Sequence, residues 1–425
     1  MTDQRRPSPG TLIVGASQSG VQVAVTMREL GYSDPITIVG AENQLPYQLP
    51  PLSKAFLSGT ADEESLELRT AAFYADKGIR LVLGEQVGEI RFDGTAGEAV
   101  TDAGRVLSFD LLALTVGAAA RRLALPGVEL SGVGYLRNMA DARRLQADLA
   151  TAESVAVIGG GFIGLEAAAA ARSFGKNVTV LETADRLIAR AVAPEVSEFY
   201  RAAHERRGTT VRLGMSVTGL VGSNGRVTGV ALEDGEVVAA EVVLIGIGVV
   251  PRLEIAEQLG LECQGGIVVD EFARTSLPGV VAAGDCAVMP NPLTGEGRVR
   301  LESMQNAVDQ AKVAAATLVG QPAKYHAVPW FWSDQGNLKL QIAGLSTGYD
   351  QIVLRGDQQA EKFSVLYYRA GHLLAIDSVN GVPDYMTVRR ALAQGGQIPA
   401  GLAADSSVPL KSIVVSAAPA AGVLA

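Results

Sequence analysis

The sequence predicts an α/β protein in which two Rossmann-like units are followed by a smaller α+β unit. Two glycine-rich turns carry this prediction, because each follows an apolar strand and opens a helix. The first turn begins at Gly15 and the second at Gly159. A third observation is the change beyond Pro322, where short alternating strands replace continuously apolar ones. With 425 residues the chain is also too long for one compact core, which agrees with two or three domains.

The individual elements are apolar runs bounded by glycine, proline or acidic residues. In the first unit we expect strands over 11–15, 36–39, 110–116, 266–270 and 280–283, and helices over 20–30 and 305–318. The second unit is expected to run from Val155 to Ile247 as strand, helix, strand and helix, followed by short strands. In the C-terminal unit we expect strands over 339–343, 351–355, 363–369 and 373–377, and an amphipathic helix over 386–392.

The second glycine-rich turn carries a complete dinucleotide fingerprint. Gly159 permits the tight turn, Gly161 lets the backbone approach a pyrophosphate, and Gly164 lets the helix pack closely on the strand. The pyrophosphate then lies at the positive end of the helix. Glu182 ends the following strand, where a carboxylate accepts hydrogen bonds from ribose hydroxyls and repels a 2′-phosphate. The pattern predicts an NADH site; the alternative is a glycine-rich turn without a ligand.

The first turn shows the same pattern with one departure. Gly15 and Gly20 occupy the first and third glycine positions, whereas Ser17 stands at the second. The Cβ of the serine crowds the closest approach to a pyrophosphate, although its hydroxyl can donate to a phosphate oxygen. Glu42, which follows the next strand, is the candidate ribose acceptor. Two dinucleotides on one chain are most economically a flavin and a nicotinamide, so we expect FAD at this turn.

These elements predict a division into domains. Residues 1–117 and 248–322 are expected to form one discontinuous FAD-binding domain, and residues 118–247 an NAD-binding domain inserted within it. Residues 323–410 are expected to form the α+β domain. Residues 411–425 are rich in alanine and serine, and we expect them to form a loosely held tail.

Composition limits the class of partner. A formal net charge of −9 and the lack of a basic run argue against nucleic acid. The longest apolar run, 155–171, contains four glycines and Glu166, so it predicts a strand, a turn and a helix and not a membrane span. We therefore expect a cytoplasmic protein, either a monomer or a homodimer, with no membrane partner.

The cysteines and histidines predict no disulfide and no metal centre. Cys263 and Cys286 are the only cysteines and form no Cys-x-x-Cys pair, which excludes a local active-site disulfide and an iron–sulfur cluster within the chain. Both are expected to be buried structural thiols in a reducing compartment. His204, His326 and His372 show no ligand-like spacing, so we expect structural or exposed side chains.

Five further motifs stand beside the two fingerprints. They are Pro50-Pro51-Leu52-Ser53-Lys54, Gly246-Ile247-Gly248-Val249-Val250-Pro251, Ala283-Gly284-Asp285-Cys286, Arg300-Leu301-Glu302-Ser303-Met304-Gln305-Asn306-Ala307 and Pro329-Trp330-Phe331-Trp332-Ser333-Asp334-Gln335. With these motifs the chain resembles the FAD-dependent ferredoxin reductases of bacterial oxygenase systems over residues 11–390. The resemblance implies a glutathione-reductase-like arrangement of the two dinucleotide-binding domains.

The resemblance implies roles for several residues around FAD. Gly117 and Gly284 lie beside the cofactor, and Asp285 hydrogen-bonds the ribityl chain and starts a helix directed at the FAD phosphates. Trp332 covers the exposed flavin edge, where a ferredoxin docks. Without the family, two tryptophans beside a phenylalanine are more often core residues.

The resemblance also pairs Lys54 with Glu166. It implies that Lys54 lies near the isoalloxazine, and that Glu166, one turn into the NAD helix, faces the nicotinamide. Gly248 is implied to line the NAD site. Taken alone, Lys54 and Glu166 are equally compatible with surface charges.

Two departures from the family accompany Ser17. The Ala-Thr-Gly stretch of the family is Thr115-Val116-Gly117 here, so Val116 loses a hydroxyl beside the flavin domain. The Tyr-Asp pair after Gln335 is replaced by Gly336-Asn337. The first departure bears on FAD binding and the second on the docking of a partner.

The function implied by the resemblance is electron transfer. NADH gives a hydride to FAD, and the electrons then pass singly to a [2Fe–2S] ferredoxin that serves a cytochrome P450 or a Rieske oxygenase. Two alternatives stay open. One is an NADH oxidase or diaphorase that uses oxygen or a quinone, and the other is a non-catalytic NADH-binding redox sensor.

Overall fold

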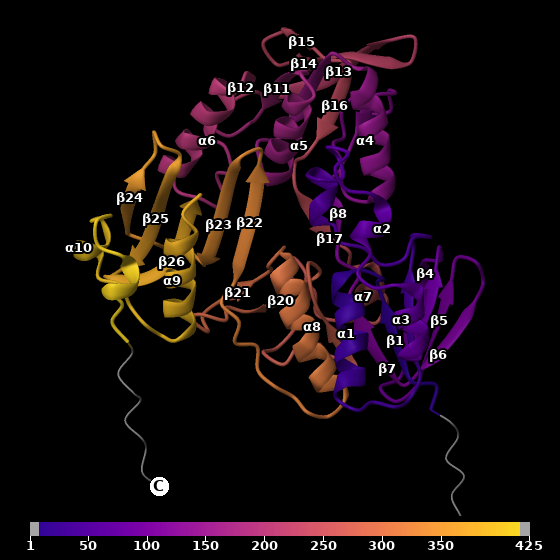
Figure 1. Ribbon diagram of the computed structural model, residues 1–425. Coiled ribbons are helices and arrows are strands. Elements are labelled where there is room, and N and C mark those ends of the chain that lie inside the picture. Colours follow the sequence, from indigo (N-terminus) through magenta and orange to yellow (C-terminus); the bar gives the residue numbers. More distant parts are fainter. Residues whose placement is uncertain (1–7, 417–425) are drawn as a thin grey trace, which may run out of the picture. The chain divides into compact units, whose positions relative to one another are not determined.

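The computed structural model describes residues 8–416 and consists of two compact units built from interleaved segments (Figure 1). Of the described residues, the first unit comprises those up to Gln48, Glu63–Ala119 and Val250–Ala327. The second unit comprises Leu49–Asp62, Ala120–Val249 and the described residues from Val328 onward. Two of the five boundaries between the units lie in the short strands β8 (Ala118–Ala120) and β17 (Val249–Pro251).

A five-stranded parallel sheet forms the centre of the first unit, in the order β19-β7-β1-β2-β3. Its strands are β1 (Thr11–Val14), β2 (Ile36–Gly40), β3 (Ile79–Leu83), β7 (Leu111–Leu114) and β19 (Val280–Ala282). The central strand β1 is buried along its whole length, as its continuous apolar sequence requires. Helices α1 (Gln18–Glu29) and α8 (Met304–Leu318) lie side by side (Figure 1).

Two small sheets complete the first unit. An antiparallel sheet of β4 (Val87–Phe92), β5 (Gly97–Thr101) and β6 (Val106–Phe109) was not predicted from the sequence. The other sheet joins β18 (Ile267–Val268), β20 (Ala287–Pro290) and β21 (Arg298–Val299). Short helices α2 (Glu63–Leu66), α3 (Ala71–Asp76) and α7 (Glu254–Gln258) connect these parts.

The prediction that a helix starts at Asp285 is wrong. The apolar residues after it form β20, which pairs in parallel with β18 through Ile267 and Ala287. The next helix is α8, whose N-cap Ser303 accepts a hydrogen bond from the Asn306 backbone N–H. The helix that packs beside α1 is therefore supplied from 18 residues further along the chain, since 303 − 285 = 18.

The second unit contains another five-stranded parallel sheet, in the order β12-β11-β10-β16-β9. Its strands are β9 (Val133–Gly134), β10 (Ser154–Ile158), β11 (Asn177–Leu181), β12 (Thr209–Arg212) and β16 (Val242–Ile245). The connecting helices are α4 (Met139–Thr151), α5 (Phe162–Ser173) and α6 (Pro194–Arg206). A hairpin sheet of β13 (Val217–Ser223), β14 (Arg226–Leu232) and β15 (Val237–Ala239) precedes β16, and the 3₁₀ helix η1 (Pro50–Ser53) packs against α5.

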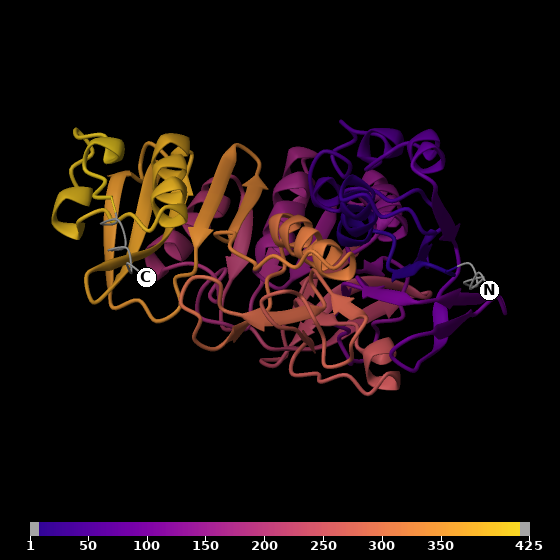
Figure 2. The ribbon, with the colours of Figure 1, turned by 90° about the horizontal axis from the view of Figure 1, so that it is seen from below.

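The C-terminal part of the second unit is an antiparallel sheet in the order β22-β23-β26-β25-β24. Its strands are β22 (Trp330–Gln335), β23 (Leu338–Gly344), β24 (Gln351–Asp357), β25 (Lys362–Arg369) and β26 (His372–Val379). Helix α9 (Val382–Ala393) lies against this sheet (Figure 1, Figure 2). Alternate residues of β25 enter different cores: Val365 and Tyr367 pack with α5 and α6, whereas Leu366 and Tyr368 pack with α9.

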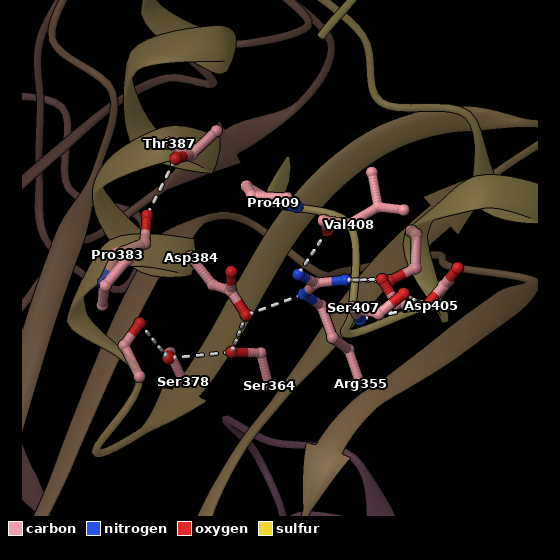
Figure 3. Close-up of polar contacts among 12 residues, drawn as sticks. Arg355, Ser364, Ser378, Pro383, Asp384, Thr387, Asp405, Ser407, Val408 and Pro409 are labelled. Atoms are coloured by element: carbon pink, nitrogen blue, oxygen red, sulfur yellow. Dashed lines mark hydrogen bonds and ion pairs between the residues drawn. The ribbon is translucent and has the colours of Figure 1, made fainter. Parts of the chain in front are cut away.

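The C-terminal segment is held by the buried Arg355 of β24 (Figure 3). Its guanidinium pairs with Asp384 and donates to the backbone carbonyls of Ala403, Asp405 and Val408. These carbonyls belong to the segment that contains α10 (Ala400–Ala403) and leads to η2 (Leu410–Ser412).

Pairing continues beyond η2. Val415 and Gln397 exchange two backbone hydrogen bonds of 2.8 Å, and Leu410 is buried. The predicted loose tail is therefore wrong for 411–416, and its remainder, 417–425, lies outside the described residues. Within residues 8–416 no helix combines the length and the apolar character that a membrane crossing requires.

Candidate dinucleotide sites and the buried Glu166 cluster

The two glycine-rich turns have the same backbone geometry. Gly15 has φ +116° and Gly159 has φ +109°, which L-residues with a side chain rarely adopt. An added Cβ would lie 2.2 Å from the carbonyl oxygen of Thr115 in the first turn, and 2.4 Å from that of Gly246 in the second. Each turn is thus pressed against the neighbouring parallel strand, and only glycine fits.

The third glycine of each turn lets a helix approach closely. A Cβ at Gly20 would lie 2.0 Å from the Gly15 carbonyl oxygen, and a Cβ at Gly164 would lie 2.2 Å from the Gly159 carbonyl oxygen. Both helices therefore begin directly over the turn. Their unpaired N-terminal backbone N–H groups provide a positive end beside it, which is the arrangement that binds a pyrophosphate.

The second position of the fingerprint is a serine in the first turn and a glycine in the second, and neither residue has a strained backbone. Ser17 is the N-cap of α1 with φ −133°, and Gly161 is the N-cap of α5 with φ −83°. A Cβ at Gly161 would meet no protein atom within 4 Å. The Ser17 side chain makes no capping hydrogen bond. The serine therefore fits the fold, and its effect is confined to a ligand.

Glu182 is fixed against the second turn. Its Oε2 accepts a hydrogen bond of 2.6 Å from the Gly160 backbone N–H, and its Oε1 accepts one of 2.8 Å from the Ala184 backbone N–H. Nearby Arg186 donates to the Val192 carbonyl oxygen at 2.8 Å and to the Ala189 carbonyl oxygen at 2.5 Å, so its guanidinium holds a loop. Of Glu182 and Arg186, it is therefore the Glu182 carboxylate whose charge lies beside the second turn.

Glu42 takes the corresponding place in the first unit. It follows β2 and accepts a hydrogen bond of 2.7 Å from the hydroxyl of Tyr47. Its side chain is half-buried, whereas Tyr47 is buried. In each unit one carboxylate thus follows the strand that comes after the helix of the glycine-rich turn.

A buried polar cluster lies beside Gly284 in the first unit. The Gly284 backbone N–H donates to Gln310 Oε1 at 2.8 Å, and Asn306 Nδ2 donates to the same oxygen at 3.3 Å. Asn306 is fully buried, yet its Oδ1 has no hydrogen-bond partner among the described residues. An unsatisfied buried acceptor costs about 1–3 kcal/mol, so a bound group that donates to it is expected. These residues and the first turn fit FAD.

Gly117 and Gly248 both adopt positive φ, at +64° and +96°. Thr115, two residues before Gly117, donates through its hydroxyl to the carbonyl oxygens of Val14 and Gly15 at 3.1 and 3.0 Å. A Cβ on Gly248 would lie 3.3 Å from the Arg190 guanidinium. The hydroxyl of Thr115 therefore supports the first turn, which the sequence did not indicate.

The predicted pair of Lys54 and Glu166 is formed inside the second unit. Lys54 Nζ lies 2.7 Å from Glu166 Oε2, and the two side chains are 18% and 1% exposed. Ser53 Oγ donates to the same carboxylate oxygen at 2.5 Å, and Ser333 Oγ donates to Oε1 at 2.6 Å. The carboxylate thus has three side-chain donors, which are Ser53 of η1, its C-cap Lys54, and Ser333 of β22; the two serines were not predicted.

Trp332 lies in β22 and is half-buried. Its ring lies 5.5 Å from that of Trp330, which carries the Arg389 guanidinium 4.7 Å above its own ring. Between them Phe331 contacts Phe162, the first residue of α5, with ring centres 4.6 Å apart. The position of Trp332 at a flavin edge stays a prediction.

The thiols and imidazoles are mostly as expected. Cys286 is buried against the carbonyl oxygens of Leu114 and Ala283, and burial raises the pKa of its thiol to about 11. Cys263 is only half-buried, so the prediction of a buried thiol is wrong there. His204 is buried and hydrogen-bonds Gln335, and burial lowers its pKa. The other two histidines, His326 and His372, are exposed.

A second buried carboxylate, Asp377, lies in β26. It accepts a hydrogen bond from the Tyr367 hydroxyl, which itself accepts one of 2.7 Å from the Ala193 backbone N–H. Asp377 Oδ1 has no hydrogen-bond partner in the part of the chain that the structure describes. Burial raises the pKa of this carboxyl to about 7.

Comparison with known proteins shows where this arrangement occurs. The chain matches the family described as pyridine nucleotide-disulphide oxidoreductase over residues 10–311, and the one described as reductase C-terminal over residues 330–414. Rhodocoxin reductase from Rhodococcus erythropolis is 44% identical over 400 residues, which cover 94% of this chain and 93% of the relative.

Two solved structures are similar along nearly the whole chain. The ferredoxin reductase for the CYP199A2 system from Rhodopseudomonas palustris has a TM-score of 0.92 and 40% identity, covering 95% of this chain and 99% of its own. The match to the covalent putidaredoxin reductase–putidaredoxin complex has a TM-score of 0.91 and 39% identity, covering 95% and 97%. The predicted fold class and the resemblance are therefore confirmed. The chain belongs to the pyridine nucleotide-disulphide oxidoreductase family, as one of its FAD- and NADH-dependent ferredoxin reductases.

Proposed function

We propose that the protein takes a hydride from NADH and passes electrons one at a time to a [2Fe–2S] ferredoxin that serves a cytochrome P450 or a Rieske oxygenase. The observation that carries this proposal is the presence of two dinucleotide turns of matching geometry in a chain whose two cysteines are free and lie in different environments. A chain without a redox disulfide has to hand its electrons to an external acceptor. The Rhodopseudomonas and putidaredoxin structures are named for such acceptor systems.

The first turn is proposed to hold FAD and the second NADH. FAD, when bound, accepts two electrons together and releases them singly. Gly15 and Gly20 bring the positive end of α1 to the pyrophosphate, and the hydroxyl of Ser17 donates to it. Glu42 accepts from the ribose, oriented by the Tyr47 hydroxyl. Gly117, Gly284, Asp285 and Trp332 are proposed to complete the FAD contacts, and Gly159, Gly161, Gly164 and Gly248 those of NADH.

Glu182 is proposed to select NADH over NADPH. Two backbone N–H groups orient its carboxylate beside the turn that holds the pyrophosphate, so its charge faces the adenosine ribose. A 2′-phosphate brought there is repelled, and Arg186 is engaged with backbone carbonyls and gives no compensation.

Glu166 is proposed to accept a hydrogen bond from the carboxamide of the nicotinamide. It lies one turn along α5 from the glycine turn, and its burial makes a fixed orientation possible. Lys54 holds this carboxylate in place through an ion pair of 2.7 Å. Orientation of this kind is a large part of the rate of a transfer between two bound groups.

The domain division is proposed to follow the predicted boundaries, with 323–410 as an α+β domain. Its support is the separate sheet β22–β26, which has its own core beneath α9.

An anaerobic NADH titration of the purified protein tests the function. We expect a bound flavin that bleaches at one equivalent of NADH, with NADPH much less effective, followed by rapid reduction of putidaredoxin as the [2Fe–2S] probe. Rapid oxygen consumption without reduction of the probe would instead support an oxidase. Slow reduction by NADH with a long-lived coloured complex would support a redox sensor, and a protein that binds no FAD would refute electron transfer.

A further inference from the structure

The Glu166 carboxylate is the end of a chain of buried hydrogen bonds that runs through β22 to α6. Ser333 Oγ donates to Glu166 Oε1 at 2.6 Å, and Gln335 Nε2 donates to Ser333 Oγ at 3.2 Å. Gln335 Oε1 lies 2.8 Å from His204 Nε2. All four side chains are buried, with exposures between 0% and 3%.

The donors of this chain all point toward the carboxylate. An amide oxygen only accepts, so His204 Nε2 carries the hydrogen in its bond to Gln335. The Gln335 amide then donates to Ser333, and the single hydroxyl proton of Ser333 goes to Glu166. Hydrogen bonds in such a series polarise one another, so the last bond is stronger than an isolated hydroxyl–carboxylate contact.

Strand alternation explains how one strand supplies this chain. Side chains at every second position of β22 share a face, so Phe331, Ser333 and Gln335 point to the same side. Phe331 contacts Phe162 of α5, which shows that this side faces the helix carrying Glu166. The opposite side carries Trp330 and Trp332, whose rings contact each other.

We propose that Ser333 and Gln335 are positioning residues for hydride transfer: they fix Glu166 Oε1 while Ser53 and Lys54 fix Oε2, so that the carboxylate stays in one orientation toward the nicotinamide. This inference rests on the proposed role of Glu166. With donors on both oxygens the carboxylate cannot rotate without breaking a buried hydrogen bond. Without Ser333, Oε1 is a buried acceptor without its protein donor, and rotation of the carboxylate becomes easier.

The titratable groups that face Glu166 are known from the same contacts. Lys54 pairs with it directly, and His204 contacts it only through the chain. Tyr200 of α6 is fully buried; burial raises its pKa, and the charges of Asp377, Asp334 and Glu166 raise it further. The tyrosine and the histidine are therefore neutral near pH 7, and Lys54 is the cation that faces the carboxylate.

Ser333→Ala is the decisive variant, with Ser378→Ala as its matched control. Ser378 is an equally buried serine of the same sheet, and its hydroxyl bonds Ser364 and the Gly381 carbonyl oxygen instead of Glu166. Rates of anaerobic NADH oxidation by the FAD-loaded protein are measured in a single turnover between pH 6 and 9. Affinity for NAD⁺, which gives no turnover, is measured by calorimetry at the same pH values.

We expect Ser333→Ala to slow the single turnover about tenfold and to bind NAD⁺ more weakly than the parent at each pH. Ser378→Ala should keep the rate and the NAD⁺ affinity of the parent. Ser333→Thr, which keeps the hydroxyl, should restore both. Should Ser333→Ala not fold, Gln335→Met, which removes the amide donors, is expected to give the same losses at smaller size.

The inference is overturned when Ser333→Ala or Gln335→Met has the rate, the pH profile and the NAD⁺ affinity of Ser378→Ala. The chain would then serve only to hold β22 against α5 and α6. Failure of the proposed function is a different result, because it appears in the parent protein, which NADH would not reduce. A parent that is reduced and a variant that behaves identically refute the positioning role alone.

Discussion

The glycines at positions 161 and 164 have different tasks, and single substitutions separate them. An added Cβ at Gly164 would lie 2.2 Å from the Gly159 carbonyl oxygen, so α5 has to move away from the turn. An added Cβ at Gly161 meets no protein atom within 4 Å, and its backbone suits any residue. We therefore expect Gly164→Ala to destabilise the protein, and Gly161→Ser to weaken NADH binding without a loss of stability.

The sizes of the two effects follow from these contacts. Ordinary contacts begin at 3.4 Å, so the new methyl group of Gly164→Ala requires a shift of 3.4 − 2.2 = 1.2 Å. Overpacking of this kind costs about 1–3 kcal/mol, and in a domain of this size each kcal/mol lowers Tm by about 2–4 °C. Serine is a favourable N-cap, so Gly161→Ser should change stability by less than about 0.5 kcal/mol. A side chain pressed against the pyrophosphate costs about 1.4 kcal/mol, which is about tenfold in Kd.

Thermal unfolding and calorimetric titration with NAD⁺ distinguish these outcomes. Gly164→Ala should lower Tm by roughly 5–10 °C, and Gly161→Ser should unfold with the parent but bind NAD⁺ about tenfold more weakly. Equal affinity of Gly161→Ser and the parent would show that the pyrophosphate does not pass over this residue. A Gly164→Ala variant with the Tm of the parent would refute the claim that the helix is pressed onto the turn.

Substitutions at three other residues test titratable side chains. Glu182→Gln removes the charge that repels a 2′-phosphate. At a separation of about 6 Å and an effective dielectric constant of about 20 this repulsion is about 3 kcal/mol, so the NADH-to-NADPH ratio of kcat/KM should fall about 100-fold. An unchanged ratio would show that another group determines the selectivity. Lys54→Met leaves the buried Glu166 without its cation and should cost about 3–5 kcal/mol in thermal unfolding, whereas Lys54→Arg should recover part of it; equal stability of Lys54→Met and the parent would refute the ion pair. Burial raises the pKa of Asp377 to about 7 from the ordinary 3.8, so the folded protein holds a proton that the unfolded chain releases. Stability should then fall between about pH 4 and pH 7 by up to about 4 kcal/mol, and Asp377→Asn should remove this slope; parallel curves of Tm against pH for both proteins would contradict it.

The parts of the fold that glycine and apolar runs define were predictable from the sequence. Gly15 and Gly159 both adopt a backbone conformation that other residues avoid, so their presence after an apolar strand reports local geometry directly. The parallel sheets follow from continuous apolar strands that need cover on both faces. In contrast, nothing distinguishes the apolar run after Asp285 as a strand until its partner β18 is in place.

The two serine partners of Glu166 were not predictable for a physical reason. Ser53 and Ser333 are 113 and 167 positions away from it in the chain, and no local periodicity relates residues at such separations. Strand β22 itself was missed because Trp330, Phe331 and Trp332 are all aromatic and show no polar alternation. The alternation is present in the packing, since neighbouring side chains of β22 face different helices.

Ser17 shows which positions of the glycine fingerprint are restricted by the protein fold and which by the ligand. The first and third glycines are required by the protein fold. A side chain at Gly15 would overlap the carbonyl oxygen of Thr115, and a side chain at Gly20 would overlap the carbonyl oxygen of Gly15. The fold permits a side chain at the middle position, since Ser17 has an extended backbone and the matching Gly161 has free space beside it. Only a bound ligand restricts the residue at this position. A serine at this position keeps the pyrophosphate further from the backbone of the turn, but it adds one hydroxyl donor at the positive end of α1. The departure that seemed to weaken the first site is therefore compatible with the same fold and with a bound pyrophosphate.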